Sequence, residues 1–244
     1  MNNWLDESKL YRLASKTSLL SAVLLALNIV GCHSANDVEP KQTGISVKRI
    51  EVPRDTLAAL TNYSLLVDSI SVVYPEIEMD TIPEFVLRFN ETLKVSATID
   101  ISDQSVIYWS DFSVGLVSNR NVSIRVNTSY YTYKAANGNS FIKTYLLDLK
   151  DGRLLGWDDV FKSDTLSLNE LKHRLEGGLV ANCPVYFKNE LASPEFRPSF
   201  FVRQDSIEFV FSEYEISPGV CGSFSVPLST EELEDLLLSP RFGS

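Results

Sequence analysis

The stretch 207–228 places the strongest limit on what this chain can fold into. Apolar residues recur at every second position over 207–211 and again over 224–228, the pattern of half-buried β-strands. Residues 217–219 between them read Ser-Pro-Gly, a sequence that breaks strands. Pro227 cannot donate a ladder hydrogen bond, so the second run is expected at the edge of a sheet.

Segments with strand and with helix periodicity precede and follow this stretch. Period-two runs predict strands at 45–50, at 64–74 and in a meander between 105 and 149, with a hairpin turn at Asn137-Gly138. Capping-box spacings predict helices at 82–97, from Ser167 and Glu170 to the glycines 177–178, and at 229–238. The predicted fold class is therefore α+β, with antiparallel sheets and a few packed helices.

The N-terminal residues predict where the protein resides. Residues 1–31 read as a leader, with basic residues before an apolar run at 19–27 that is too short to span a bilayer. The sequence 29–32, Ile-Val-Gly-Cys, resembles the lipobox of bacterial lipoproteins, which predicts cleavage before Cys32 and lipid on its thiol. A short membrane anchor or an ordinary secretory signal is the alternative. Polar residues 32–44 would form a flexible tether, and the expected location is the bacterial cell envelope, at the periplasmic face of the outer membrane or on the cell surface.

Charge and cysteine content narrow the possible partners. The chain has 22 basic and 32 acidic residues, a net charge of −10, and no basic stripe, so no nucleic-acid partner is expected. Cys183 and Cys221 would meet an oxidising compartment if the leader is functional. A disulfide between Cys183 and Cys221 would close a loop of about 38 residues and stabilise the fold by ~4 kcal/mol. Two unpaired buried thiols are the alternative.

Catalytic residue sets are sparse in this sequence. His33 falls in the tether and His173 on a predicted helix, which leaves no nucleophile–base pair and no zinc set. We therefore predict a non-catalytic protein without cofactor or metal. Glu213 and Glu215 share one strand face and could act as paired carboxylates. A second acidic group comprises Asp148, Asp151, Asp158 and Asp159. These residues could act as catalytic acids or as Ca²⁺ ligands. The alternative is that they only form a turn and the start of a helix.

Five triplets read Asp-[Ser/Thr]-aliphatic, which looks like the acceptor motif of periplasmic O-glycosylation in some Gram-negative bacteria. Such pairs also open turns and helices without any modification. The candidate acceptors are Thr56, Ser69, Thr81, Thr165 and Ser206.

Several segments resemble a known family when taken in order. Residues 122–133, 145–161 and 207–228 resemble the DUF3298 domain. The second segment contains an Asp-to-Phe feature at 148–161, and the third contains Tyr-Glu-Ile-Ser-Pro-Gly-Val-Cys-Gly at 214–222. Residues 74–94 resemble the DUF4163 region that commonly precedes that domain. The expected boundaries are a DUF4163-like region at 45–150 and a DUF3298-like region at 151–244, packed as one unit.

The resemblance implies an extracytoplasmic α+β domain. Relatives form the outer parts of RsiV-like anti-sigma factors, where the domain binds lysozyme, and appendages of cell-wall deacetylases whose catalysis lies in another domain. This chain has Ala135-Ala-Asn-Gly138 where relatives often have a histidine-containing turn. We expect neither the transmembrane segment nor the cytoplasmic domain of an anti-sigma factor, so the lysozyme-receptor role is not carried over.

These observations predict a lipid-anchored binding or sensory module whose ligand is a protein or a cell-envelope glycan. Its candidate ligand surface comprises Tyr131, Tyr133 and Trp157, with core packing as the alternative fate of these rings. An envelope hydrolase that uses paired carboxylates is one competing interpretation, and a purely structural envelope lipoprotein is another.

Overall fold

The computed structural model describes residues 44–53, 56, 70–98, 105–132 and 134–239. They lie in one compact unit, Glu39–Ser244. The fold is α+β, as predicted, with a five-stranded and a three-stranded sheet. The predictions for the leader, for Cys32, for Ser69 and for Tyr133, and nearly all of the tether, lie outside the described residues.

The larger sheet has the order β1-β2-β3-β4-β5. Its strands are β1 Ile45–Glu51, β2 Ile70–Met79, β3 Ser105–Val117, β4 Asn121–Thr132 and β5 Asn139–Asp148. The hairpin predicted at Asn137-Gly138 joins β4 to β5, which pair antiparallel. The antiparallel meander predicted between 105 and 149 is confirmed, because β3 pairs antiparallel with β4 and β4 with β5. β2 and β3, by contrast, are parallel. Parallel neighbours need a crossover connection, and a helix supplies it.

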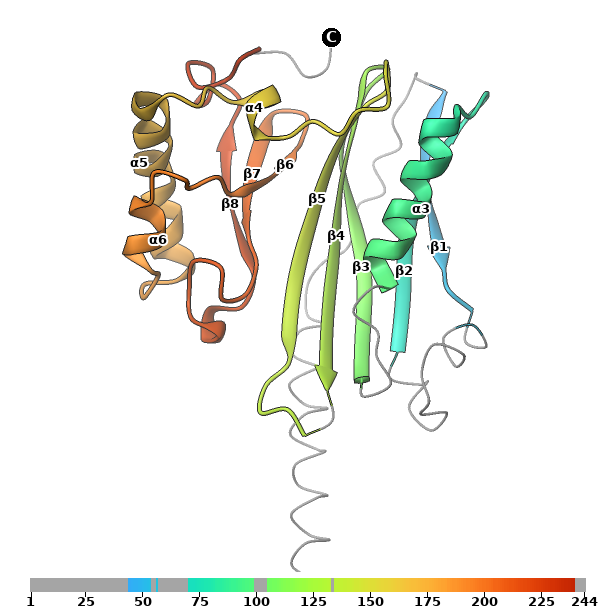
Figure 1. Ribbon diagram of the computed structural model, residues 1–244, viewed down its shortest axis with the longest axis horizontal. Coiled ribbons are helices and arrows are strands. Elements are labelled where there is room, and N and C mark those ends of the chain that lie inside the picture. Colours follow the sequence, from blue (N-terminus) through green and yellow to red (C-terminus); the bar gives the residue numbers. More distant parts are fainter. Residues whose placement is uncertain (1–43, 54–55, 57–69, 99–104, 133, 240–244) are drawn as a thin grey trace, which may run out of the picture. The chain divides into compact units, whose positions relative to one another are not determined.

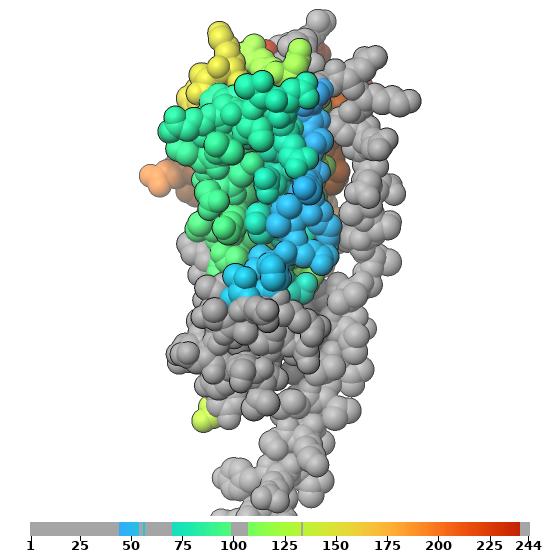
Figure 2. Space-filling view, turned by 90° about the vertical axis from the view of Figure 1, so that its right-hand side faces the viewer, coloured from blue at the N-terminus to red at the C-terminus, as the bar shows by residue number. Residues whose placement is uncertain are grey.

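That helix is α3, Glu84–Thr98, within two residues of its predicted bounds. Figure 1 shows α3 running alongside β2, and Figure 2 shows its outer surface next to β1. Val86 and Leu93 are fully buried on its inner side. The buried side chain of Asn90 accepts a hydrogen bond from the backbone N of Ile77 (2.9 Å) and donates one to its backbone O (3.0 Å). This amide therefore pairs a β2 residue as a neighbouring strand would.

The smaller sheet has the order β6-β7-β8, formed by β6 Ser199–Val202, β7 Ser206–Phe211 and β8 Phe224–Ser229. The predicted edge position of Pro227 is confirmed, since β8 pairs only with β7 among the described strands. Phe209 and Phe211 are fully buried on one face of β7, and Glu208 and Val210 are buried on the other. The central strand is thus covered on both faces.

The longest helix departs from its predicted bounds at both ends. α5 spans Thr165–Asn182, and the carboxylate of Asp164 caps it by accepting hydrogen bonds from the backbone N of Leu166 and Ser167. The expected capping box at Ser167 is therefore wrong. The helix also continues through Gly177 and Gly178, because tertiary packing outweighs the low helix propensity of glycine.

Short elements complete the described fold. They are α4 Trp157–Val160, α6 Lys188–Ala192 and the 3₁₀ helix η2 Gly219–Cys221. Among the helices the structure describes, none combines the length and apolar character that a membrane crossing requires.

The helix predicted at 229–238 is a series of turns instead. Leu236 accepts a backbone hydrogen bond from Lys162 (2.9 Å), and Leu238 donates one to Val160 (2.9 Å). These bridge-type bonds to the segment after α4 compete with helical bonds at the end of the chain. The inward leucines were predicted correctly, since Leu233, Leu236 and Leu237 are buried.

A buried ion pair joins the two sheets. The Arg125 Nη1 of β4 donates to the Glu208 Oε2 of β7 at 2.8 Å, and both residues are buried. Burial lowers the pKa of Arg125, while the Glu208 carboxylate opposes that shift. The backbone N of Val202 also donates to Ser123 Oγ (3.1 Å). A Cβ at Gly115 would lie 2.1 Å from Val202 O, so β3 and β6 approach closely only because that position is glycine.

The two neighbouring glycines of α5 offer a matched test of its packing. A Cβ at Gly178 would lie 2.3 Å from Val226 Cγ1 in β8, whereas at Gly177 nothing lies within 4 Å. We expect Gly178→Ala to destabilise the fold by about 1–3 kcal/mol through overpacking. Gly177→Ala should instead stabilise it by about 0.5–1 kcal/mol. Urea unfolding of both variants measures the difference, and equal effects would contradict this packing.

Candidate functional site

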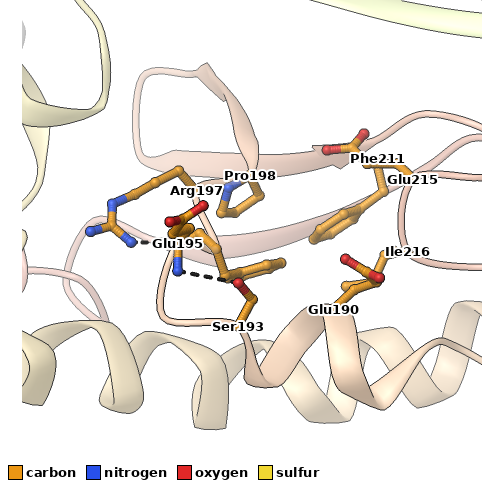
Figure 3. A pocket seen from close by; sticks show the side chains of 9 residues that line it. Glu190, Ser193, Glu195, Arg197, Pro198, Phe211, Glu215 and Ile216 are labelled. Atoms are coloured by element: carbon orange, nitrogen blue, oxygen red, sulfur yellow. Dashed lines mark hydrogen bonds between the residues drawn. The ribbon is translucent and has the colours of Figure 1, made fainter.

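A pocket of about 180 Å³ opens between α6 and the chain segment that follows β7. Figure 3 shows its side chains converging from α6, from the loop before β6 and from the end of β7. The residues that line it are Glu190, Ser193, Glu195, Phe196, Arg197, Pro198, Phe211, Glu215 and Ile216. This volume is smaller than the roughly 300–1,000 Å³ of pockets for drug-sized ligands, so it admits a small group or a single ring.

Aromatic and apolar groups form part of the wall. Phe211 ends β7 and is fully buried, whereas Phe196 is half-buried. Their rings are stacked, with centroids 6.4 Å apart and an interplanar angle of 18°. Ile216 is buried beside them. Phe196 therefore offers its partly exposed ring to a ligand, and the buried Phe211 and Ile216 support that ring from behind.

Three carboxylates line the same pocket: Glu190 on α6, Glu195 in the following loop, and Glu215 after β7. Glu215 accepts a hydrogen bond from the backbone N of Ser212 (2.8 Å). The crowding of protein around the Glu215 carboxylate raises its pKa, and the hydrogen bond only partly opposes this. Among the described residues, none of the three forms an ion pair within 4.0 Å.

Arg197, the one basic residue among those that line the pocket, binds groups other than the three carboxylates. Arg197 Nη1 donates to the backbone O of Pro194 (3.2 Å) and to that of Phe196 (2.9 Å). Its guanidinium carbon also lies 5.7 Å from the ring centroid of Trp157, a cation–π distance. Arg197 is therefore held by its own loop and by Trp157, and leaves the carboxylates with little compensation.

A covalent link and a backbone bond hold the pocket walls together. Cys183, at the end of α5, forms a disulfide with Cys221 of η2, 38 residues further along the chain. Phe187, at the start of α6, donates its backbone N–H to Ile216 O (2.7 Å). The pocket residues thus lie inside a loop that the disulfide closes. The sequence left open whether these cysteines pair, and the structure joins them.

The paired carboxylates considered at Glu213 and Glu215 do not converge. Glu213 Oε2 accepts from the backbone N of Ser140 (2.9 Å) and from Ser140 Oγ (3.3 Å), which ties it to β5. Glu215 belongs to the pocket instead. The intervening Tyr214 has φ +66°, a left-handed conformation that turns the chain between them.

The acidic group at Asp148, Asp151, Asp158 and Asp159 forms local hydrogen bonds in turns and at a helix start. Asp148 and Asp151 each accept a hydrogen bond from a backbone N two residues on. Asp158 accepts from Ser163 Oγ, and Asp159 accepts from the backbone N of Gly156 (2.8 Å). Within the ranges that the structure describes, no group of three or more candidate ligands could hold a metal ion.

Two residues of the predicted aromatic surface, Tyr131 and Trp157, take part in contacts within the fold. Tyr131 is half-buried and donates its hydroxyl to Ala135 O (2.6 Å). Trp157 is half-buried and stacks on Phe161 with centroids 4.4 Å apart. Trp157 still reaches the pocket indirectly, through Arg197.

The candidate glycosylation residues differ in accessibility. Thr56, Thr81 and Thr165 are exposed, whereas Ser206 is half-buried within β7 and precedes the fully buried Ile207. Glycosylation stays a prediction at all five positions.

Sequence reasoning missed most of the pocket. Glu190, Glu195 and Phe196 fall within a proline-rich stretch that has no clear period, and α6 was not predicted there. Three pocket residues did lie in segments with a sequence signal: Phe211 in the period-two run at 207–211, and Glu215 and Ile216 in the DUF3298-like feature at 214–222. His173 is exposed on α5, as expected.

Comparisons with known proteins bear on these findings. No family model matches the chain. Among curated proteins, the chain is similar to the peptidoglycan-N-acetylmuramic acid deacetylase PdaC of Bacillus subtilis (strain 168), with 24% identity over 141 residues. That match covers 55% of this chain and 28% of the relative, so the chain spans little more than a quarter of that protein's length.

Two solved structures resemble the chain, and both are described as DUF3298 family members. The one from Bacteroides fragilis NCTC 9343 is 18% identical with a TM-score of 0.46, covering 82% of this chain and 96% of its own. The one from Pseudomonas aeruginosa PAO1 is 12% identical with a TM-score of 0.49, covering 84% and 98%. The DUF4163-like region, the domain boundaries and the lipoprotein leader stay predictions.

The disulfide gives a first prediction about the site. Replacing both Cys183 and Cys221 by serine should lower the free energy of unfolding by about 4 kcal/mol, because the unfolded chain regains the freedom of a 38-residue loop. Urea unfolding measures this loss. Dithiothreitol should destabilise the wild type to a similar extent and leave the double variant unchanged. A wild type insensitive to reductant would contradict the prediction.

Glu215 gives a second prediction. Its raised pKa means that the folded protein disfavours the ionised carboxylate, a penalty present at neutral pH and absent once the pH falls below the usual carboxyl pKa. Glu215→Gln should therefore have a higher Tm than the wild type at pH 7. The two Tm values should converge as the pH is lowered through the acid range. A variant less stable than the wild type at pH 7 would refute this reasoning.

Proposed function

We propose that this protein is an extracytoplasmic, lipid-anchored binding module that recognises a cell-envelope glycan through the pocket around Glu190, Phe196 and Glu215. The lipid would be attached at Cys32. The observation that carries the proposal is the combination, in one small pocket, of the partly exposed Phe196 ring, held by stacking on Phe211, with carboxylates that lack a cationic partner among the described residues. Aromatic faces pack on the C–H faces of sugar rings, and carboxylates accept hydrogen bonds from sugar hydroxyl and amino groups.

The similarity to PdaC favours a glycan over a protein ligand. The name of that relative states that it acts on peptidoglycan, and the match covers more than half of this chain. A segment shared with an enzyme of the cell wall is well suited to hold its substrate. The net charge of −10 agrees with a partner other than nucleic acid.

A second candidate function has one specific observation in its favour. Glu215 has a raised pKa and lies in the same pocket as Glu190 and Glu195. A carboxyl group with a raised pKa beside a second carboxylate is the arrangement that glycoside hydrolases use. An envelope hydrolase built on these residues would replace the predicted pair of Glu213 and Glu215. A structural lipoprotein is the remaining interpretation, and it predicts no ligand.

Co-sedimentation with purified peptidoglycan tests the binding proposal. The full chain in detergent should pellet with insoluble sacculi, and Phe196→Ala should reduce the pelleted fraction by roughly tenfold, since base or sugar stacking on one ring contributes about 1–3 kcal/mol. Leu166→Ala serves as the control, because Leu166 is 82% exposed and does not line the pocket.

The same mixture distinguishes the three functions. Binding without release of reducing ends supports the binding module. Release that Glu215→Gln abolishes supports the hydrolase. A wild type that stays in the supernatant and releases nothing contradicts both and leaves the structural role.

A further inference from the structure

We infer that the pocket selects sugars that carry a free, protonated amine over their N-acetylated forms. This inference rests on the proposed glycan-binding function and adds the chemical class of the ligand. It depends on the balance of charge in the pocket, on the nature of the pocket wall, and on the size of the space.

The charge balance of the pocket is strongly negative. Glu190 and Glu195 line it without a side-chain hydrogen bond or ion pair to another described residue, and Glu215 accepts only the Ser212 N–H. Arg197 directs its guanidinium to two backbone carbonyls and to the Trp157 ring. A ligand that brings a positive charge would therefore meet carboxylates that no described cation already pairs.

The wall favours an organic cation over a metal ion. Over the described residues, no cluster of three or more acidic, histidine or cysteine side chains is arranged to hold a metal. Phe196 places ring surface beside the carboxylates, and the buried Phe211 stacks behind it. Ring faces attract ammonium groups and also pack on C–H groups. An amino sugar has an ammonium group and a C–H face within one ring, so it matches both parts of the wall.

The size of the pocket limits the ligand to about one ring. A volume of about 180 Å³ leaves room for a single sugar unit in the pocket, with neighbouring units outside. An N-acetyl group would add bulk and would replace the ammonium by a neutral amide. The amide has one N–H and no charge, whereas an ammonium has a positive charge and three N–H donors that carboxylates can accept. The pocket should therefore distinguish the two forms at the nitrogen atom.

The class of reaction that supplies such a ligand is also defined. Hydrolysis of an N-acetyl sugar breaks the amide C–N bond, adds water across it, and yields acetate and a free amine. The name of the similar Bacillus subtilis protein denotes this type of reaction on peptidoglycan. We infer that this protein acts after such a deacetylation and recognises its product.

Isothermal titration calorimetry with a matched pair of ligands tests the inference. The full chain in detergent is titrated at pH 6.5 with chitotetraose and with its fully N-deacetylated counterpart, which differ only at nitrogen. The deacetylated form should bind roughly tenfold tighter or better, as one charge-assisted hydrogen bond would produce. The variant with both Glu190→Gln and Glu195→Gln should lose this preference, and Leu166→Ala should keep it. A circular dichroism spectrum and Tm confirm that the double variant is folded.

Each other outcome has a defined meaning. Equal or tighter binding of the acetylated tetramer overturns the inference and leaves the proposed glycan function in place. Failure of both tetramers, together with failure to pellet with peptidoglycan, overturns both. A lysine-rich peptide is titrated in parallel. Binding of that peptide without binding of either sugar overturns the inference and indicates a basic protein as partner.

Discussion

The buried ion pair between Arg125 and Glu208 is the interaction on which the rest of the described structure depends. A charge that is removed from water without its partner costs several kcal/mol, so β4 and β7 can meet only in the register that brings these two side chains together. Arg203 contacts the other Glu208 oxygen, and Ser225 Oγ donates to Glu208 at 3.1 Å, which satisfies the remaining carboxylate positions. The pair contributes little net stability by comparison with apolar packing. Its effect is to exclude alternative arrangements of the two sheets.

The register of β7 in turn determines where the pocket forms. Glu208 and Phe211 belong to one strand, so a β7 that is anchored at Glu208 delivers Phe211 to the pocket floor and sends Glu215 into the wall. The opposite wall comes from α6, which is tied back by the bond from Phe187 to Ile216. A rigid scaffold therefore presents Glu215, whose pKa is raised by the protein around it, in the same pocket as Glu190 and Glu195. Perturbed carboxyl groups in a pocket are typical of functional sites.

Much of the fold could be predicted from sequence, because its signals are local. The period-two runs located β1, β7 and β8, the Pro227 edge position followed from the missing N–H, and the hairpin at Asn137-Gly138 followed from turn chemistry. The errors arose where tertiary contacts override local preference. The burial of Arg125 has no local signal, because the residue alternates with apolar neighbours as a solvent-facing residue would, whereas the second sheet covers that face of β4. The glycines of α5 read as a helix stop, yet Gly178 is required for close contact with Val226. The pocket could not be predicted, because Glu190, Glu195 and Phe196 meet Glu215 only through the folding of an aperiodic segment.

The position of the disulfide along the chain has a consequence for when the site exists. Every residue that lines the pocket, from Glu190 to Ile216, lies between the two bonded cysteines. In a reducing environment the two cysteines are not bonded, and only non-covalent contacts hold the ends of this segment together. Under the proposed function, ligand recognition would be coupled to thiol oxidation, and a newly synthesised molecule would acquire its full binding capacity only in a compartment that can oxidise it.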